Sequence, residues 1–318
     1  MDDLLTRARA GEVRALARLL TWVENRARGI ESVMKEAYLA AGNARIVGIT
    51  GSPGAGKSTL VDGLVTAYAA SGAKTAVIAV DPSSPFTGGA ILGDRIRMSG
   101  HDRGADVFVR SMATRGHLGG LGAATADIVT VMDAAGRDPV LIETVGVGQD
   151  EVEIARIADI SVVILMPGMG DDVQALKAGI MEIGDIFVIN KCDRPGADEL
   201  ERTIRGMLAL APEHSGAVDA PIIRTIATRN EGIGELRDAI ARMHADTGRE
   251  TDRVARKRDA VTARLRALLE ERLVGTALER VSSNGKFESI VDSVVRREQD
   301  PYTAIEAIID NAGFGGRS

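Results

Sequence analysis

The fold is decided by the stretch RIVGITGSPGAGKSTLVDG, which runs from Arg45 to Gly63. Its first part is a short apolar strand, and residues 51–58 fit the glycine-rich pattern G-x-x-x-x-G-K-[ST]. A helix is predicted from Lys57 onward, so the loop lies between a strand and a helix, as this pattern requires. Glycines let successive backbone amides point into one concavity, and the helix N-terminus adds partial positive charge. The stretch therefore predicts a binding site for the phosphates of a nucleotide.

The residues of this loop have separate expected roles. Lys57 is expected to reach the β- and γ-phosphates, the Ser58 hydroxyl to ligate Mg²⁺, and Thr59 to touch the α-phosphate. A glycine-rich turn with a chance lysine is the alternative, and the order of strand, loop and helix argues against it. The other residues expected to bind the nucleotide here are Gly51, Ser52, Pro53, Gly54, Ala55 and Gly56.

Further oxygen ligands for Mg²⁺ are expected at the ends of strands, because a hard cation prefers oxygen donors. Asp81 ends the run VIAVD and Glu143 ends the run VLIE. Each directly follows a run of apolar strand residues, which favours a ligand over a helix cap or a solvated loop charge.

A second motif predicts that the base is guanine. VINKCD, residues 188–193, contains Asn-Lys-x-Asp after an apolar strand. Asp193 can accept hydrogen bonds from N1–H and the 2-amino group of guanine, and adenine offers neither. A site built for such bonds rejects a ligand that lacks them by about 10⁴-fold or more. Lys191 is expected to lay its stem over the purine face, and Asn190 to tie this loop to the phosphate loop.

A third segment, TIATRNEGIGEL, covers residues 225–236 and resembles the fifth GTPase motif. In that motif the N–H of Ala227 would meet guanine O6. Ile226 stands where a Ser is common, which leaves a backbone contact possible but changes the loop. The three segments together favour GTP over ATP.

Apolar runs without polar alternation predict strands that are buried on both faces. Helices are expected between them, and this succession predicts an α/β fold with a doubly wound, mainly parallel sheet. Ligands of such sheets bind at the carboxyl ends of the strands, where the motifs above also lie. The strands are expected within residues 45–50, 74–84, 106–112, 139–148, 160–168, 185–193 and 220–228.

Helical segments flank this core. Residues 1–42 are predicted as two helices, and residues 249–318 as a helical appendage whose long first helix carries the apolar stripe Val261, Leu265, Leu268, Leu269 and Leu273. The same chain or a second subunit would cover that stripe. The expected division is therefore an N-terminal extension over 1–42, a nucleotide-binding domain over 43–248 and a C-terminal arm over 249–318.

Composition excludes several classes of partner. The net charge is −6 and aromatic residues make up 3%, which argues against nucleic acid and against an anionic membrane surface. Cys192 is the single cysteine, so no intramolecular disulfide is possible. The N-terminus lacks the apolar run of a signal peptide, and we expect a soluble cytoplasmic protein.

The order VDPSS, GDRIRM, RGHLGG, ETVGVGQDE, MPGMGDDVQALKAGIMEIGD and NKCD resembles the MeaB family, GTPases that chaperone adenosylcobalamin-dependent acyl-CoA mutases. The resemblance covers nearly the whole chain. It implies a P-loop GTPase domain of the SIMIBI, metallochaperone type and a homodimer formed through the C-terminal arm. It also implies a mutase partner, typically methylmalonyl-CoA mutase, whose adenosylcobalamin loading is gated by GTP binding and hydrolysis.

The resemblance also assigns residues. Ser58, Asp81, Asp94 and Glu143 would group around Mg²⁺, and Gly146 of the segment ETVG would sense the γ-phosphate. Residues 168–177 would form a switch loop that meets the mutase, although an ordinary charged helix start is the alternative there. The polar members of this loop are Asp171, Asp172, Gln174 and Lys177.

The residues disfavour three other functions. A nickel or cobalt metallochaperone GTPase would need a cluster of Cys and His, and the chain offers one Cys and four widely spaced His. An ATPase or kinase of an amino-acid transport system would not need Asn-Lys-x-Asp. A binding module without hydrolysis is disfavoured by Lys57, Ser58 and Glu143.

Overall fold

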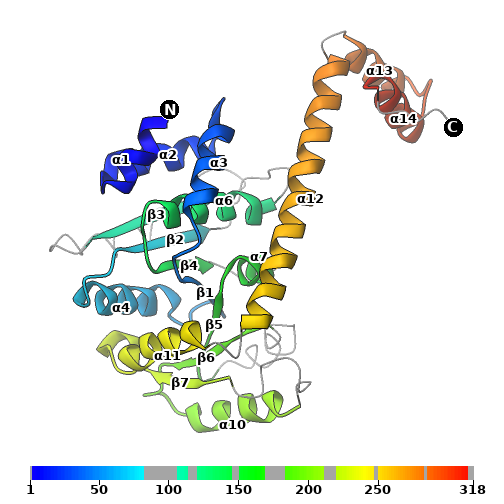
Figure 1. The fold of residues 1–318 in the computed structure, drawn as a ribbon. Coiled ribbons are helices and arrows are strands. Elements are labelled where there is room, and N and C mark those ends of the chain that lie inside the picture. Colours follow the sequence, from blue (N-terminus) through cyan, green and yellow to red (C-terminus); the bar gives the residue numbers. More distant parts are fainter. Residues whose placement is uncertain are drawn as a thin grey trace. The chain divides into compact units, whose positions relative to one another are not determined.

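Seven strands form one parallel sheet in the part of the chain that the structure describes (Figure 1). The structure is a computed structural model, and it describes residues 2–81, 106–113, 120–144, 150–168, 183–210, 220–246, 250–282 and 285–313. The strand order is β3-β2-β4-β1-β5-β6-β7, and every neighbouring pair is parallel. The strands are β1 (Ile46–Gly51), β2 (Thr75–Asp81), β3 (Val107–Ala113), β4 (Val140–Thr144), β5 (Ile160–Leu165), β6 (Ile186–Asn190) and β7 (Ile222–Thr225).

Helices alternate with these strands along the chain. A helix is also expected between the strands at 160–168 and 185–193, but residues 169–182 lie outside the described part of the chain. The helices before and between the strands are α1 (Asp2–Arg9), α2 (Val13–Glu24), α3 (Ile30–Ala40), α4 (Lys57–Ala70), α6 (Gly120–Ala134), α7 (Asp150–Ile157) and α10 (Ala197–Leu208). After the last strand come η5 (Ala227–Arg229), α11 (Ile233–Ala245), α12 (Glu250–Ser282), α13 (Lys286–Val295) and α14 (Pro301–Asn311).

The central strands of the sheet are buried on both faces. In β5, Val162 and Ile164 belong to the core that includes α4 and α11, whereas Val163 and Leu165 belong to the core that includes α10. Successive strand residues point to opposite faces, so a strand covered on both sides shows a continuous apolar run. This confirms the predicted doubly wound parallel sheet and explains why the sequence shows no polar alternation in its strands.

The strand order places the phosphate loop at the point where the sheet changes direction. After β1 the chain builds β2, β3 and β4 on one side, and it then builds β5, β6 and β7 on the other. In open α/β sheets, ligands bind outside the carboxyl ends of the strands at such a point. Residues 51–58 directly follow β1 there.

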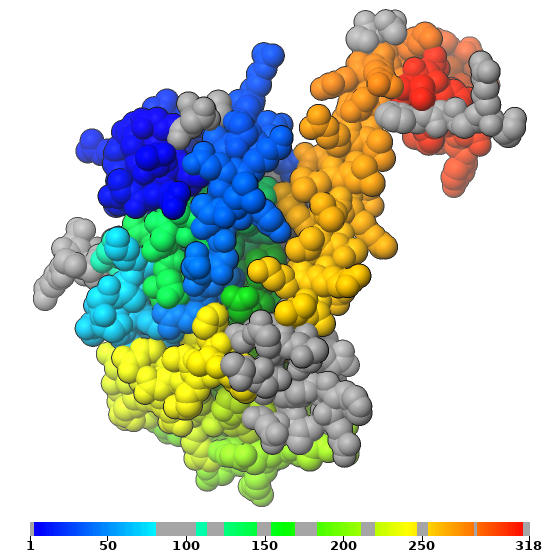
Figure 2. Space-filling model, in the orientation of Figure 1, coloured from blue at the N-terminus to red at the C-terminus, as the bar shows by residue number. Residues whose placement is uncertain are grey.

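The N-terminal segment contains three helices instead of the two that were predicted. Gly11 has φ +92° and Gly29 has φ +84°, a left-handed backbone that ends one helix and starts the next. Buried Leu16, Leu19 and Leu20 of α2 join the same core as residues of α6. The helices therefore pack on the sheet domain, and they form its dark blue and bright blue surface in Figure 2.

The chain divides into two compact units, Met1–Ala260 and Val261–Ser318. The first turns of α12 are fixed to the first unit because Arg256 donates two hydrogen bonds to the Asp185 carboxylate, at 3.0 and 2.9 Å. In the second unit, Arg280 donates to the carbonyl of Ala312 at 2.5 Å, which ties the end of α12 to the end of α14. The expected boundaries at 42/43 and 248/249 stay predictions. No helix in the described parts of the chain combines the length and apolarity needed to cross a membrane.

Candidate functional site

The loop after β1 has a backbone that only glycine can follow at two positions. Gly51 has φ +142°, and a Cβ there would lie 2.0 Å from the carbonyl oxygen of Ile164 in the neighbouring strand. Gly56 has φ +92°, and a Cβ there would lie 2.5 Å from Asn190 Nδ2. The two glycines therefore let the loop lie flat against β5 and against the end of β6.

Lys57 begins α4 and folds back over the loop. Its side chain is buried, and Nζ donates to the carbonyl of Gly51 at 2.6 Å and to that of Ser52 at 3.1 Å. An ammonium group at the N-terminus of a helix is well placed to meet an anion, because both the charge and the helix dipole favour negative charge there. Thr59 lies in the same first turn, half-buried.

A buried carboxylate lies beside the hydroxyl of Ser58. Glu143 is 2% exposed, and the Ser58 Oγ donates to its Oε1 at 2.5 Å. Two oxygen donors, one of them a carboxylate shielded from water, fit a hard divalent cation such as Mg²⁺. β2 runs beside β4 with Val80 opposite Thr144, so the backbone of Asp81 ends at the same edge of the sheet. Asp94 and Gly146 lie outside the described residues.

Asn190 joins the two loops, which confirms the predicted tie. It ends β6 and is 2% exposed. Its Nδ2 donates to the carbonyl of Ala55 at 2.8 Å, while its Oδ1 accepts from Thr225 Oγ1 at 3.0 Å and from the N–H of Ala227 at 3.1 Å. One side chain thus holds the phosphate loop, the 190–193 loop and the segment after β7 together.

The 190–193 loop contacts the phosphate loop a second time. Lys191 has φ +59°, and its Nζ donates to the carbonyl of Gly54 at 2.6 Å. The Asp193 side chain is 42% exposed, and its carboxylate lies 3.9 Å from the Arg229 guanidinium. Asp193 is therefore accessible to a ligand, in contrast to Asn190.

The structure adds detail that the motifs did not predict. The N–H of Ala227, expected to meet guanine O6, donates to Asn190, so a contact to O6 would share this hydrogen. Thr225 and Arg229 were missed. A polar residue ending a buried strand was the signal for Thr225, whereas Arg229 shows no sequence signal, because only the fold of η5 brings it near Asp193.

Most of the predicted site residues that the structure describes lie together at the carboxyl edge of the sheet. They are residues 51–59, Glu143, Asn190, Lys191, Asp193 and Ala227. The predicted switch-loop residues Asp171, Asp172, Gln174 and Lys177 lie outside the described part of the chain. Among the residues that the structure describes, no group of three or more His, Cys, Asp or Glu is placed to hold a metal ion.

Comparisons with known proteins point to the same chemistry. The family model described as Methylmalonyl Co-A mutase-associated GTPase MeaB matches residues 16–282. A protein of Pyrococcus abyssi with the provisional name of a GTPase is 44% identical over 320 residues, which are 100% of this chain and 98% of its own length.

Two further relatives differ in what they are named for. The fused isobutyryl-CoA mutase of Geobacillus kaustophilus is 37% identical over 215 residues, which are 64% of this chain and 20% of its own length. The crystal structure of a LAO/AO transport system kinase superposes with a TM-score of 0.70 at 25% identity, covering 97% of this chain and 96% of that one.

Proposed function

The chain belongs to the MeaB family of methylmalonyl-CoA mutase-associated GTPases, and on this premise we propose that it is a chaperone of an adenosylcobalamin-dependent acyl-CoA mutase. In this proposal, GTP binding and hydrolysis gate the loading of intact adenosylcobalamin into the mutase and the protection or reactivation of a mutase whose cofactor is damaged. Methylmalonyl-CoA mutase is the proposed partner, because the family description names it.

One observation carries the choice of partner. The relative from Geobacillus kaustophilus is named as a fused mutase, and about a fifth of its length aligns with 64% of this chain. In that protein, the segment homologous to this chain is part of a polypeptide that is named as a mutase. Two proteins that occur fused in one organism commonly act together when separate, which supports a mutase as the partner of this chain.

The described contacts support a definite placement of the nucleotide. We propose that the amides of 51–58 and the Lys57 ammonium bind the β- and γ-phosphates, and that Asp193 accepts from the guanine edge. Ser58 and Glu143 would hold Mg²⁺, with Asp81 and Asp94 nearby. When bound, Mg²⁺ neutralises charge on the phosphate oxygens during transfer. Lys57 contributes a second positive charge from the protein itself.

The change from bound GTP to bound GDP would be transmitted to the mutase through the segments that follow β2, β4 and β5. In switch GTPases, the γ-phosphate holds such segments and hydrolysis releases them. Gly146 would donate its N–H to the γ-phosphate. Asp171, Asp172, Gln174 and Lys177 would contact the mutase. These roles rest on the family resemblance.

The proposal predicts a nucleotide-dependent complex. The purified chain should bind methylmalonyl-CoA mutase, and a non-hydrolysable GTP analogue should change the affinity by about tenfold or more relative to no nucleotide, a typical allosteric coupling. Lys57→Ala should bind the mutase equally with and without the analogue. Calorimetric titration of the mutase with each chain measures this. An affinity that does not change with the analogue would contradict nucleotide gating. Failure to form any complex would contradict the choice of partner.

We also propose that the second unit forms a homodimer. The side chains of Leu265 and Leu269 on α12 are 62% and 59% exposed in the single chain, and the other large apolar residues exposed on α12 within this unit are Val261, Leu268, Leu273, Val274 and Leu278. A helix with this much exposed apolar surface is typical of an interaction site. A second copy is the proposed cover, in agreement with the family resemblance.

Leu265→Asp combined with Leu269→Asp should convert the dimer into a monomer. Both residues are exposed in the single chain, so the substitutions bring no core disruption, but each would bury a carboxylate in the dimer interface. Light scattering measures the mass, and GTP binding should persist. Leu210→Asp is the control, because Leu210 is 87% exposed and lies outside the arm. A double variant that stays dimeric would contradict the role of α12.

A further inference from the structure

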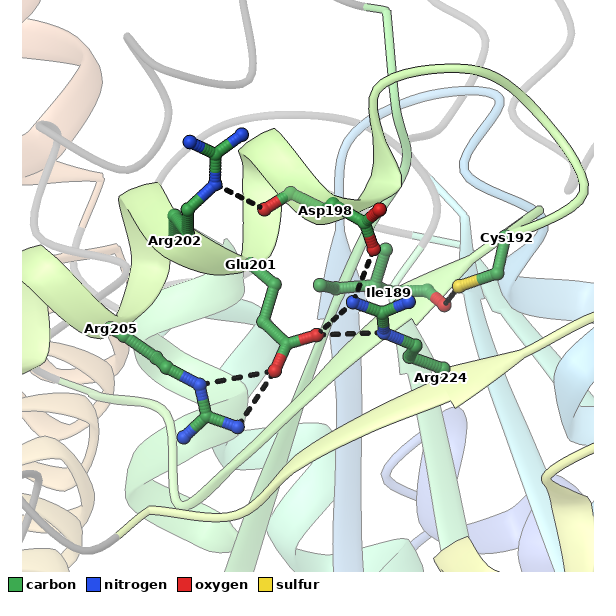
Figure 3. A network of polar contacts seen from close by, with 7 residues as sticks. All are labelled: Ile189, Cys192, Asp198, Glu201, Arg202, Arg205 and Arg224. Carbon is green, nitrogen blue, oxygen red and sulfur yellow. Dashed lines mark hydrogen bonds and ion pairs between the residues drawn. The ribbon is translucent and has the colours of Figure 1, made fainter.

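A polar network joins α10 to β7 close to the proposed base site (Figure 3). We call it the Glu201 network, and its side chains are Asp198, Glu201, Arg205 and Arg224. The Glu201 carboxylate is at its centre: Arg205 donates to Oε1 from Nη2 at 2.7 Å and from Nε at 3.0 Å, and Arg224 donates to Oε2 from Nε at 2.7 Å. Arg224 also pairs with Asp198 at 2.7 Å.

Glu201 is the shielded member of the network. The side chain of Glu201 is 16% exposed, although the Arg224 side chain is 48% exposed. The pKa of Glu201 lies below its ordinary value because Arg205 and Arg224 donate hydrogen bonds to its carboxylate. Because its pKa is lowered, the ionised Glu201 carboxylate stabilises the folded state at neutral pH. This stabilisation is lost as the pH falls through the lowered pKa.

Arg224 lies in β7, just before the segment with Ala227 that is proposed to contact the base. In the sheet it lies opposite Ile189, and the next residue, Thr225, lies opposite Asn190. The segment after β7 folds back onto Arg224, because a Cβ at Gly232 would lie 2.1 Å from the Arg224 carbonyl oxygen. The backbone of Arg224 therefore packs directly against this segment.

Glu201 is connected to the Asp193 loop, on the other side of the same site. It lies on α10, which begins at Ala197, four residues after Asp193. The Asp193 loop and the end of β7 also contact each other directly, because the N–H of Cys192 donates to the Thr225 carbonyl at 3.2 Å. The pair Glu201–Arg224 thus closes a ring that runs through β6, the Asp193 loop, α10 and β7.

We propose that the Glu201–Arg224 pair is a positioning pair for guanine selectivity, which holds the Asp193 loop and the Ala227 segment at a fixed separation. Neither residue touches the base in this proposal. It rests on the proposed role of Asp193 in reading guanine. The pair sets how well Asp193 reaches both the N1–H and the 2-amino group, so it acts on the discrimination between guanine and hypoxanthine, which lacks the 2-amino group.

The test compares GDP with IDP on the full-length chain. Calorimetric titration gives the ratio of the two dissociation constants for the wild type, for Arg224→Ala and for Glu201→Gln. Each variant should lower the GDP preference by at least about threefold, the size expected for residues coupled in one network. Arg224→Lys should restore most of the preference, because lysine keeps a charge that can reach Glu201.

The matched control is Arg202→Ala. Arg202 lies on the same helix, is exposed, and donates from Nε to the backbone carbonyl of Asp198 at 3.2 Å. The substitution Arg202→Ala removes the same charge as Arg224→Ala, and it should leave the ratio of the GDP and IDP dissociation constants unchanged. Loss of fold alone lowers the active fraction without changing this ratio, so Glu201→Gln, which keeps the side-chain shape, covers the case in which Arg224→Ala unfolds.

The outcomes separate this inference from the proposed base site. If Asp193→Asn lowers guanine selectivity and both network variants keep the wild-type ratio, the positioning role is overturned and the base site stands. If Asp193→Asn itself keeps the wild-type selectivity, the base reading on which the inference rests is overturned. A lower ratio in the network variants with an unchanged ratio in Arg202→Ala supports the inference.

Discussion

Lys57→Ala is expected to abolish the thermal stabilisation that guanine nucleotides give this protein. A ligand at 100 times its dissociation constant stabilises the folded state by about 2.7 kcal/mol. For a domain of this size, that corresponds to a rise of roughly 5–10 °C in the unfolding midpoint. The Lys57 ammonium is the buried positive charge in the phosphate loop, where it now bonds the carbonyls of Gly51 and Ser52. Without it, the triphosphate loses the counter-charge that the phosphate loop itself supplies.

Thermal unfolding with and without GTP measures this effect. The variant should show a shift near zero, while its midpoint without nucleotide reports any loss of stability from the two carbonyls that lose their donor. Lys35→Ala is the control, because Lys35 is exposed on α3 and removes the same charge. A GTP shift equal to that of the wild type would contradict the phosphate site.

Asp193→Asn is expected to change the preferred base from guanine to xanthine. The carboxylate accepts from two donors of guanine, whereas an amide offers a donor that suits the 2-oxo group of xanthine. Sites that hydrogen-bond their ligand discriminate by about 10⁴-fold, so we expect the preference for GDP over XDP to fall by about 10³-fold or more. The side chain is 42% exposed, so the substitution should leave the fold intact.

Competition between GDP and XDP for a fluorescent guanine nucleotide measures the change. Asp238→Asn provides the control, because Asp238 is exposed on α11 and loses the same charge. Retained preference for GDP in Asp193→Asn would show that another group reads the base.

The sequence was sufficient for the features that depend on local patterns. The phosphate loop could be predicted because a strand, glycines at 51 and 56, and a helix beginning with Lys57 all occur within a few residues. The sheet could be predicted because its central strands are buried on both faces and therefore show nearly unbroken apolar runs. Asn190 was assigned correctly as a tie because its motif fixes its place at the end of a strand.

Features that depend on contacts between distant residues could not be predicted. The insertion of β4 between β1 and β2 brings Glu143 to Ser58. No local signal gives that strand order, and only the family resemblance led us to expect the two residues together. The pairing of Arg224 with Glu201 joins residues 23 positions apart on different elements. The number of N-terminal helices was wrong because the apolar spacing continues across Gly11, and only the left-handed backbone there shows the break.

The central claim is that the phosphate loop and Asp193 bind the two ends of one guanine nucleotide. A crystal structure of the full-length chain with GDP and Mg²⁺ tests it most directly. The account predicts the phosphates against the amides of 51–58 and the purine edge on the Asp193 carboxylate. A purine bound away from Asp193, with the phosphates still in the loop, would contradict it.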